Sequence, residues 1–417
     1  MPRKNEYIAV LDIGSTKVCA ILGQILEKRR MQVIAMGQSE SKGMRRGVVV
    51  DMDEAVQAIG QAVSEVESAA GIQMESAFVG ISGEHIQGGN SSGVLPIRSR
   101  HGEIGPEDIQ RVIEAAQSII TVPAERELVH IIPQEFIIDG QEGIYNPTGM
   151  TGNRLEVNVH LVTGNSSIIQ NLITAVNHAG VTVENVVLQP LASAESVLTR
   201  DEKEQGCLVL DIGGGTTDLA VFTRNAVWST AILPVAGSHI TRDLAVGLRT
   251  PVPEAEHLKK IFTCVDPLLL KEEKTFEVPG VGGGLPRTYS NRILYEIGQP
   301  RAEEILQLAL AEVKKLGFEK QQLMAGVILT GGGSLLEGLL TLAEHVFDLP
   351  IRRGYPGAMD GLTESMRTPA NATAVGLLLY GLKSRTNQLV GEVRSRQSGG
   401  IFNRWINGTL DWFSRKF

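Results

Sequence analysis

Two segments of the sequence combine acidic, hydroxyl and glycine residues in the same order. They are YIAVLDIGSTKVCAIL (residues 7–22) and GCLVLDIGGGTTDLAVF (residues 206–222). In each, an apolar run ends in Asp-Ile-Gly, a turn of Gly, Ser or Thr follows, and a second apolar run leaves. This pattern predicts a β-hairpin with a polar tip. Because the segments recur in the two halves of the chain, they also predict two half-molecules of similar architecture.

The residue types at the two tips suit a magnesium-bound nucleoside triphosphate. Glycine lets backbone N–H groups approach phosphate oxygens with no Cβ in the way, and short hydroxyls and a lysine add further donors. Carboxylates repel phosphate, so Asp12 and Asp211 are expected to hold Mg²⁺ through its waters. A plain tight turn could explain one such segment, but two matched copies favour binding. The tip residues expected to contact nucleotide are Gly14, Ser15, Thr16, Lys17, Gly213, Gly214, Gly215, Thr216 and Thr217.

A third glycine-rich segment is GVILTGGGSLLEGLL, residues 326–340. It predicts a short strand, a turn at Gly331, Gly332 and Gly333, and a helix capped by Ser334. The free N–H groups of such a helix start would face a ligand. Neither the spacing GxGxxG nor GxxxxGK[ST] is present, which disfavours the Rossmann and P-loop folds.

The composition excludes several classes of protein. With 417 residues, 42% of them hydrophobic, the chain can form two or more domains with their own cores. No apolar run reaches the roughly 18 residues of a membrane-spanning helix, and the N-terminus lacks a secretory h-region. Three isolated cysteines, Cys19, Cys207 and Cys264, predict a reducing cytoplasm without disulfides or zinc. The net charge of −8 disfavours nucleic acid as a partner.

Two Asp-Ile-Gly hairpins followed by a Thr-Gly-Gly-Gly turn resemble the superfold of actin, heat-shock protein 70 and the sugar kinases. The resemblance implies an α/β protein in which two RNase-H-like domains close on ATP. The segments 189–193 (QPLAS) and 372–376 (ATAVG) resemble the two helices that connect those domains. Gly237 resembles the loop residue that touches the nucleotide after the second hairpin. Glu256 and Lys259 resemble the pair that brackets adenosine, with an exposed ion pair as the alternative.

The same resemblance implies residues for ATP turnover. Gln189 occupies the position of the group that orients the attacking water, and Asp218 is a second candidate. A glutamine positions water but cannot serve as a strong base. We therefore expect nucleotide binding with at most slow ATPase activity, so that ATP clamps the two halves together.

Within the superfold, the chain resembles the family of bacterial cell-division proteins FtsA. The segment from about residue 84 to 161 is diagnostic, since that family carries there a small α/β module called 1C, of the SHS2 type. Gly105-Pro106 predicts a helix start, and two alternating runs around the turn at Asn146-Pro147 predict strands. Segments similar to the family's text are SKGMRRGVVVDMDEAVQAI, AFVGISGEHI, HIIPQEFIIDGQEGIYNPTGMTG, RLEVNVHLVTG, DIGGGTTDLAVF and GVILTGGG.

The resemblance also implies a division of the chain into domains. The expected ranges are 1–83, 162–204 and 370–383 for the first actin-like domain (1A), 84–161 for 1C, 205–244 and 320–369 for the second actin-like domain (2A), 245–319 for subdomain 2B, 384–400 for a flexible linker and 401–417 for an amphipathic helix.

The last seventeen residues, IFNRWINGTLDWFSRKF (401–417), hold two of the three Trp residues. On a helix their large apolar side chains share one half of the circumference, which predicts a helix lying in the surface of an anionic membrane. The polar stretch 384–400 before it ends in Gly-Gly and predicts a tether. Docking on the protein's own core is the alternative. The membrane-binding residues expected are Ile401, Phe402, Trp405, Ile406, Leu410, Trp412, Phe413 and Phe417.

By resemblance, the protein is expected to form filaments and to tether the tubulin-like protein FtsZ to the cytoplasmic face of the inner membrane at the division site. FtsZ would contact 2B, and 1C would serve self-association and recruitment of later division proteins. A membrane-bound scaffold that no longer uses ATP is one alternative. A sugar kinase of the same superfold is another, although no substrate-facing Asp base is recognisable.

Overall fold

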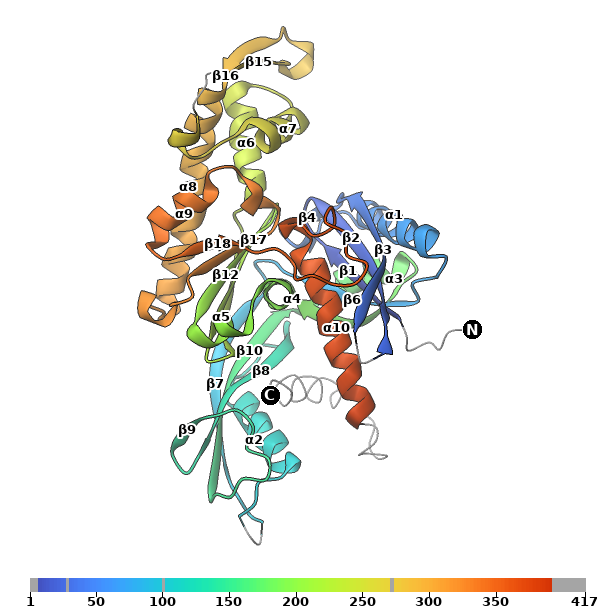
Figure 1. Cartoon of the computed structure of the whole chain (residues 1–417). Helices are drawn as coiled ribbons and strands as arrows, with labels where there is room; N and C mark the ends of the chain where they lie inside the picture. The colour runs from blue at the N-terminus through green and yellow to red at the C-terminus, as the bar shows by residue number, and fades with distance from the viewer. Residues whose placement is uncertain (1–6, 28–29, 100–101, 271–273, 392–417) are drawn as a thin grey trace.

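The computed structural model describes residues 7–27, 30–99, 102–270 and 274–391. Figure 1 shows two lobes that each contain a β-sheet, a small module below them, and two helices that cross between the lobes. This arrangement confirms the α/β fold expected from the paired hairpins. The described part of the chain contains no helix with the length and apolar character needed to span a bilayer.

The first lobe contains a five-stranded sheet in the order β11-β6-β1-β2-β3. β1, β2 and β3 are antiparallel neighbours, and β6 and β11 extend the sheet in parallel. Helices α1 (Met52–Ala70) and α3 (Ser166–His178) contribute to the same apolar core. The strands are β1 (Tyr7–Ile13), β2 (Lys17–Ile25), β3 (Met31–Glu40), β6 (Ser76–Ile81) and β11 (Thr182–Leu188).

The second lobe repeats this topology in the order β14-β13-β12-β17-β18. Again the first three strands in sequence are antiparallel and the last two join in parallel. The repeat read from the two hairpin segments therefore extends to both whole sheets. The strands are β12 (Cys207–Ile212), β13 (Thr217–Thr223), β14 (Ala226–Leu233), β17 (Val327–Thr330) and β18 (Ile351–Arg353).

Further helices complete the second lobe beyond its sheet. α6, α7 and α8 form its upper part in Figure 1 together with the hairpin of β15 and β16. Their buried side chains join those of α9 and the sheet in one core. The elements are α6 (Gly237–Leu248), α7 (Val252–Phe262), β15 (Thr275–Val278), β16 (Arg287–Ser290), α8 (Asn291–Lys315) and α9 (Leu339–Phe347).

Two helices connect the lobes and cross at a glycine. They are α4 (Gln189–Val197) and α10 (Ala372–Gly391). A Cβ on Gly376 would lie 1.7 Å from the carbonyl oxygen of Ala192, so the two helices touch backbone to backbone. The Ser196 hydroxyl adds a hydrogen bond of 2.7 Å to the carbonyl of Ala372. The crossing therefore fixes the distance between the two helices.

The inserted module is a four-stranded sheet, β7-β10-β8-β9, covered by α2. As predicted, α2 begins with Gly105 as N-cap and Pro106 in its first turn. The module also binds the second lobe, because the Gln134 amide donates to the carbonyls of Val227 and Trp228 in β14, at 3.2 and 3.0 Å. Its elements are β7 (Gln87–Pro96), α2 (Pro106–Ile119), β8 (Arg126–Ile138), β9 (Gln141–Ile144) and β10 (Arg154–Asn165).

Several of the expected domain limits divide single elements and need correction. The limit at 161/162 divides β10, whose pairing with β8 continues to Asn165. The limit at 244/245 divides α6, and those at 204/205 and 369/370 fall within α5 (Arg200–Gln205) and the 3₁₀ turn η6 (Pro369–Asn371). A backbone hydrogen-bond ladder holds each element as one unit, so the limits belong at its ends.

The expected linker 384–400 begins too early. α10 continues to Gly391, and Arg385 anchors it by donating to the Glu184 carboxylate at 2.6 Å and to the Tyr7 carbonyl at 2.7 Å. Polar residues within a helix and polar residues in a tether give the same local sequence signal, so composition alone does not place this boundary. Residues 392–400 and the expected membrane helix 401–417 lie outside the described residues.

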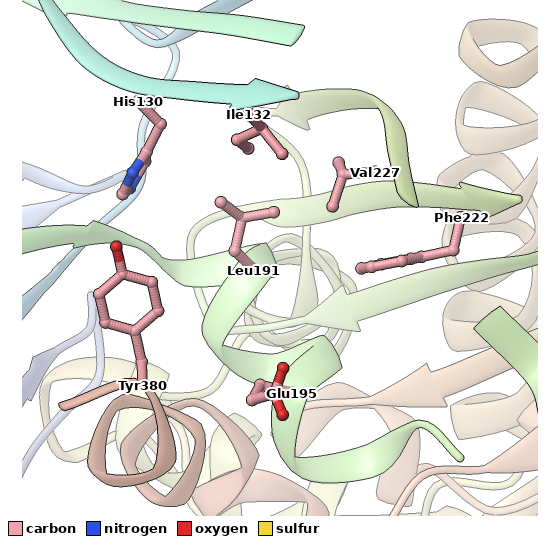
Figure 2. Close-up of a pocket in the computed structure, with 7 residues that line it drawn as sticks. All are labelled: His130, Ile132, Leu191, Glu195, Phe222, Val227 and Tyr380. Carbon is pink, nitrogen blue, oxygen red and sulfur yellow. The ribbon is translucent and has the colours of Figure 1, made fainter. Parts of the chain in front are cut away.

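A small cavity lies where the inserted module meets both lobes (Figure 2). Its volume is about 30 Å³, enough for a water molecule and far too small for a nucleotide. Figure 2 shows His130 and Tyr380 on one side of it and Phe222 on the other. The cavity is lined by His130, Ile132, Leu191, Glu195, Phe222, Val227 and Tyr380, and none of them belongs to the hairpin tips.

Buried histidines predict acid sensitivity of the fold. Burial lowers the pKa values of His130 and His160 from 6.5 to about 4, so the unfolded chain takes up their protons first as the pH falls. Their contribution to stability is present above about pH 6.5 and is lost as the pH falls toward 4. We expect His160→Gln to reduce the slope of unfolding free energy against pH by up to about 1.4 kcal/mol per pH unit in this window.

The measurement is urea denaturation at a series of pH values, with the exposed His178→Gln as the matched control. His160 lies between the Asn90 side-chain oxygen (2.7 Å) and the Thr230 hydroxyl (2.8 Å), contacts that a glutamine can partly keep. An unchanged slope in His160→Gln would contradict the assignment.

Candidate functional site

The tips of the two Asp-Ile-Gly hairpins meet between the lobes. Each tip is closed by a hydrogen bond, from Gly14 N to Lys17 O (2.9 Å) and from Gly213 N to Thr216 O (3.0 Å). A Cβ on Gly214 would lie 2.4 Å from Thr16 Cγ2, and one on Gly215 would lie 2.4 Å from Ser15 Oγ. The glycines therefore allow the two tips to touch, which brings together residues from both halves of the sequence.

Three aspartates are buried just behind these tips. Asp12 lies one residue before the end of β1 and accepts a hydrogen bond of 3.1 Å from the Gln189 amide. Asp211 lies one residue before the end of β12 and accepts hydrogen bonds from the hydroxyls of Ser193 and of Thr373, the latter at 3.0 Å. Asp218 is the cross-strand neighbour of Asp211. The first hairpin has Cys19 at the matching position, opposite Asp12.

Burial disfavours the ionised form of these carboxylates. It raises the pKa of Asp12 from 3.8 to about 7, with Lys17 opposing the shift and Asp211 adding to it. Burial and then the Asp211 charge raise the pKa of Asp218 to about 7 as well. The pKa of Asp211 is also raised by burial, against the hydrogen bonds from Ser193 and Thr373. A cation bound beside these carboxylates would favour the ionised form of all three.

These residues fit a magnesium ion held through water. Oδ1 of Asp218 is buried without a hydrogen-bond partner in the described part of the chain. No three acidic, histidine or cysteine side chains of the described residues converge closely enough to ligate a metal directly. Mg²⁺ prefers oxygen ligands and usually keeps several of its waters, so outer-sphere contact with two or three carboxylates suits it.

Lys17 extends from the first tip toward the start of α10. Its ammonium donates to the Ala370 carbonyl at 2.7 Å and to the Asn371 side-chain oxygen at 2.6 Å. Both acceptors belong to η6. Lys17 thus ties the first hairpin to the second connecting helix in this structure, and its contact with phosphate stays a prediction.

Gln189 and Asp218, the residues expected to act on the attacking water, lie on a connecting helix and on the second lobe, respectively. Gln189 is the first residue of α4, and its amide is held by Asp12. Asp218 lies on β13, close to the Ser82 and Thr216 hydroxyls, which are 3.5 Å apart. The structure brings both residues to the three-carboxylate cluster, while their catalytic roles stay predictions.

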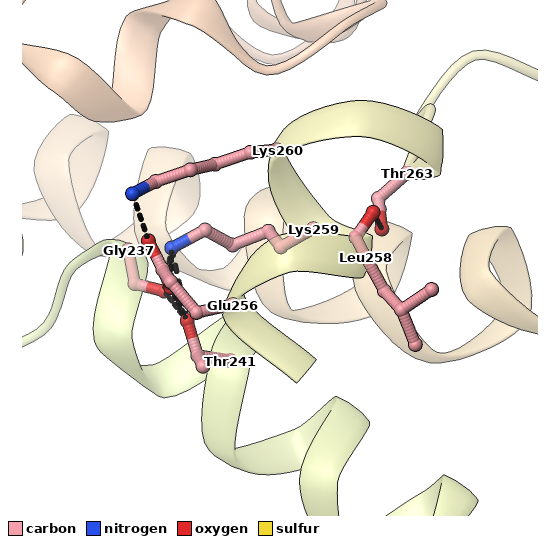
Figure 3. A network of polar contacts seen from close by, with 7 residues as sticks. All are labelled: Gly237, Thr241, Glu256, Leu258, Lys259, Lys260 and Thr263. Carbon is pink, nitrogen blue, oxygen red and sulfur yellow. Dashed lines mark hydrogen bonds and ion pairs between the residues drawn. The ribbon is translucent and has the colours of Figure 1, made fainter. Parts of the chain in front are cut away.

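Gly237 opens α6 beside the second tip. Its N–H donates to the Gly213 carbonyl at 3.1 Å. Figure 3 shows the network around it, in which the Lys259 ammonium reaches the Gly237 carbonyl (3.1 Å), the Thr241 hydroxyl (2.9 Å) and the Glu256 carboxylate (2.7 Å). The Lys259 side chain is only 15% exposed, so the pair with Glu256 fastens α7 to the start of α6 and is not an exposed surface pair.

The charges of this network support each other. Burial alone would raise the pKa of Glu256, but the charge and hydrogen bond of Lys259 and a bond from Thr241 outweigh it and lower that pKa. Lys260 adds a second ion pair to Glu256, at 3.3 Å. Glu256 is therefore ionised and already held in place, which is the preorganisation that a nucleoside-binding residue requires.

The Thr-Gly-Gly-Gly turn differs from its expected form. β17 ends at Thr330, but a short 3₁₀ turn, η5 (Gly332–Leu335), follows, and α9 begins only at Leu339. Ser334 does not cap a helix, because its hydroxyl donates to the Gly331 carbonyl at 2.7 Å. Gly331 instead supports the carboxylate cluster, since a Cβ at this position would lie 2.3 Å from Asp211 Oδ1.

The site therefore contains residues that the sequence pattern did not single out. Ser193, Asn371 and Thr373 hold Asp211 and Lys17, although they lie on or beside the connecting helices. Ser193 lies one helical turn after Gln189, a spacing that could have placed it on the same face. All predicted nucleotide residues that the structure describes lie at the tips, at the adjoining turns or in the α6–α7 network.

Two lobes of one topology, closing with paired hairpins on a shared carboxylate cluster, define an actin-like protein. Comparison with solved structures agrees: the type IV pilus complex PilM–PilN matches with a TM-score of 0.64 at 18% identity, covering 90% of this chain and 98% of that one. MreB5 of Spiroplasma citri bound to AMPPNP matches with a TM-score of 0.56 at 16% identity, covering 94% and 100%. At these identities the likeness shows the fold alone.

The chain belongs to the family of the cell division protein FtsA. The family model described as cell division protein FtsA matches residues 208–376, and the one described as the SHS2 domain inserted in FtsA matches 83–163. The FtsA of Pseudomonas aeruginosa is 43% identical over 385 residues, covering 92% of this chain and 91% of that protein. The FtsA of Neisseria meningitidis is 40% identical over 417 residues, covering 98% and 100%.

Proposed function

We propose that this protein binds ATP with Mg²⁺ between its lobes, assembles into filaments and tethers FtsZ to the cytoplasmic face of the inner membrane at the division site. The observation that carries the nucleotide part is the cluster of Asp12, Asp211 and Asp218 behind the two touching tips. Family membership supports the role in cell division. The actin-like fold supports assembly, since a solved filament, the MamK double helix, shares it with a TM-score of 0.51 at 13% identity.

Each lobe supplies part of the proposed nucleotide site. The N–H groups and hydroxyls of both tips would bind the phosphates, and Glu256 with Lys259 would bracket the nucleoside. Asp12 and Asp211 would hold Mg²⁺ through its waters, and the ion would neutralise phosphate charge. Because these residues come from both lobes, bound nucleotide would hold the lobes together and fix one conformation.

Gln189 would orient a water rather than deprotonate it, because its amide is no base and already donates to Asp12. We therefore propose slow ATP turnover at most. FtsZ would contact the part of the second lobe that contains α7, α8 and the hairpin of β15 and β16. The inserted module would serve self-association and the recruitment of later division proteins.

Membrane attachment is assigned to residues 401–417. A single amphipathic helix of this kind binds an anionic surface reversibly, whereas many such helices on one filament bind through their high effective concentration. Assembly and membrane binding would thus reinforce each other.

The test is sedimentation with vesicles of anionic bacterial lipid. We expect the full chain to pellet with vesicles, and to pellet about tenfold or more strongly with ATP and Mg²⁺, because a filament multiplies the anchors. A chain ending at Gly400 should stay in the supernatant, while still binding nucleotide. The matched control is the full chain with ADP and EDTA.

Each alternative outcome has a distinct meaning. Equal pelleting of both chains would overturn the anchor. Pelleting that is independent of nucleotide, together with no measurable ATP binding, would identify a scaffold that no longer uses ATP.

A further inference from the structure

Arg46 of the first lobe and His239 of the second lobe face each other beside the hairpin tips. Arg46 lies in the turn between the short strands β4 (Met44–Arg45) and β5 (Val48–Val49), and His239 lies in the first turn of α6. Arg46 Nη2 is 3.4 Å from His239 Nε2. This contact has the distance of a hydrogen bond, so the chemistry of its two nitrogens decides what it is.

The neighbouring hydrogen bond assigns the proton of the imidazole. His239 Nδ1 accepts the backbone N–H of Ala236, at 3.2 Å, so Nδ1 carries no proton and Nε2 does. A guanidinium has only donors. Two donors therefore face each other, and the contact is not a hydrogen bond. Such a pair is satisfied when an oxygen acceptor lies between or beside the two groups.

The charges around His239 also call for an anion. Burial, and beyond it the charges of Arg46, Arg242 and Arg301, lower the pKa of His239. Arg301 is neutralised by Asp243 and Glu304. In the described part of the chain, Arg46 and Arg242 have no such ion pair, and this leaves positive charge at the site.

The position of Arg46 ties this pair to the tips. A Cβ on Gly215 would lie 3.1 Å from Arg46 Cα, and the N–H of Gly47 donates to the Ser15 hydroxyl at 3.3 Å. On the His239 side, the N–H of Ser238 donates to the Gly214 carbonyl at 2.9 Å. Both donors thus stand on backbone that contacts the tips directly.

Arg46 occupies this position in a strained backbone conformation. Its φ is 49°, in the left-handed region that a two-residue hairpin turn requires and that Gly, Asn or Asp adopt more readily. Backbone conformations of this kind are enriched at ligand-binding sites.

We propose that Arg46 and His239 together bind a phosphate oxyanion between the lobes, next to the hairpin tips. The oxyanion is either the terminal phosphate of the bound nucleotide or free inorganic phosphate. The first source rests on the proposed nucleotide function, whereas the binding of a phosphate oxyanion does not. In either case the anion links the two lobes through one donor from each. The lobes would then be held more tightly with phosphate present than without it.

The experiment uses the full chain and three variants. Arg46→Asn removes the charge with a residue that tolerates a positive φ, and His239→Asn removes the distal donor while its oxygen, near the position of Nδ1, can still accept from Ala236. Arg45→Asn, at the exposed neighbouring position, is the matched control for loss of one positive charge. The probes are inorganic phosphate alone, measured by its effect on the thermal midpoint against chloride of equal ionic strength, and the affinities for ATP and ADP measured by calorimetry.

We expect phosphate to stabilise the unaltered protein and Arg45→Asn, and its affinity to fall about tenfold or more in Arg46→Asn and His239→Asn, the effect of one charge-assisted hydrogen bond. If the terminal phosphate of ATP is the occupant, the two variants lose a similar factor for ATP and none for ADP. If free phosphate is the occupant, ATP and ADP affinities stay unchanged and only the phosphate response is lost.

The inference is overturned if Arg46→Asn and His239→Asn match Arg45→Asn in both the phosphate response and the ratio of ATP to ADP affinity. If nucleotide binding is intact in that case, the proposed function is unaffected. Conversely, an Arg46-dependent phosphate response in a protein that binds no nucleotide would refute the proposed function and retain this site.

Discussion

Replacing Asp12 with asparagine is expected to stabilise the metal-free protein at about pH 8 and to remove most of the stabilisation by ATP and Mg²⁺. The pKa of Asp12 is about 7 in the folded protein, against 3.8 in the absence of its surroundings. A raised pKa means that stability is full below about 3.8 and is lost as the pH rises through 7. The ionised carboxylate therefore costs up to about 4 kcal/mol at pH 8, which the neutral amide avoids.

The variant is close to isosteric, since its amide oxygen can still accept the bond from Gln189. Urea denaturation in EDTA should show the gain at pH 8 and little difference near pH 4, where both side chains are neutral. In the presence of ATP, adding Mg²⁺ should raise the free energy of unfolding of the unaltered protein. In Asp12→Asn, the affinity for Mg²⁺ that this rise reports should be at least about tenfold lower.

Asp201→Asn is the control, because it removes one exposed carboxylate from the same chain. A loss of stability in metal-free Asp12→Asn, or an undiminished effect of Mg²⁺, would contradict the magnesium assignment.

The second large effect is expected from a single methyl group where the connecting helices cross. Gly376→Ala places a Cβ 1.7 Å from the Ala192 carbonyl oxygen and 2.3 Å from its carbon, and neither atom can move without shifting α4. We expect a loss of at least about 3 kcal/mol in the free energy of unfolding, because the clash is with backbone and not with a flexible side chain.

Gly60→Ala is the matched control, since it makes the same substitution within helix α1 at a position where a Cβ meets no atom within 4 Å. It should stabilise the protein by about 0.5–1 kcal/mol, the ordinary gain of alanine over glycine in a helix. Equal stabilities for Gly376→Ala and Gly60→Ala would show that the helices do not cross as closely as described.

The parts of this fold that were predictable have local signatures. The Asp-Ile-Gly hairpins are visible because alternating apolar strands and a glycine tip lie within one short segment, and α2 is visible because Gly105-Pro106 marks its start. The supports of the site were not predictable in this way. Asp211 depends on hydroxyls from two helices that are distant in sequence, and the bond from Lys17 reaches Asn371 at the far end of the chain.

The turn after β17 shows why a correct motif can be given a wrong local structure. Gly331 to Gly333 do follow a strand, but Gly338, with a φ of 80°, packs against Asp266 so closely that a Cβ would lie 2.6 Å away. This tertiary contact interrupts the helix that the residues between would otherwise favour. Propensity alone carries no information about it.

The hydrogen bonds between the inserted module and β14 limit how the protein can move. The module's sequence interrupts the first lobe, yet Gln134, His160 and Asn90 attach it to Val227, Trp228 and Thr230 of the second. A hinge motion that separates the lobes must break these bonds or move the module along with the second lobe. The binding of another protein to the module would therefore depend on this motion, and would in turn oppose or favour it.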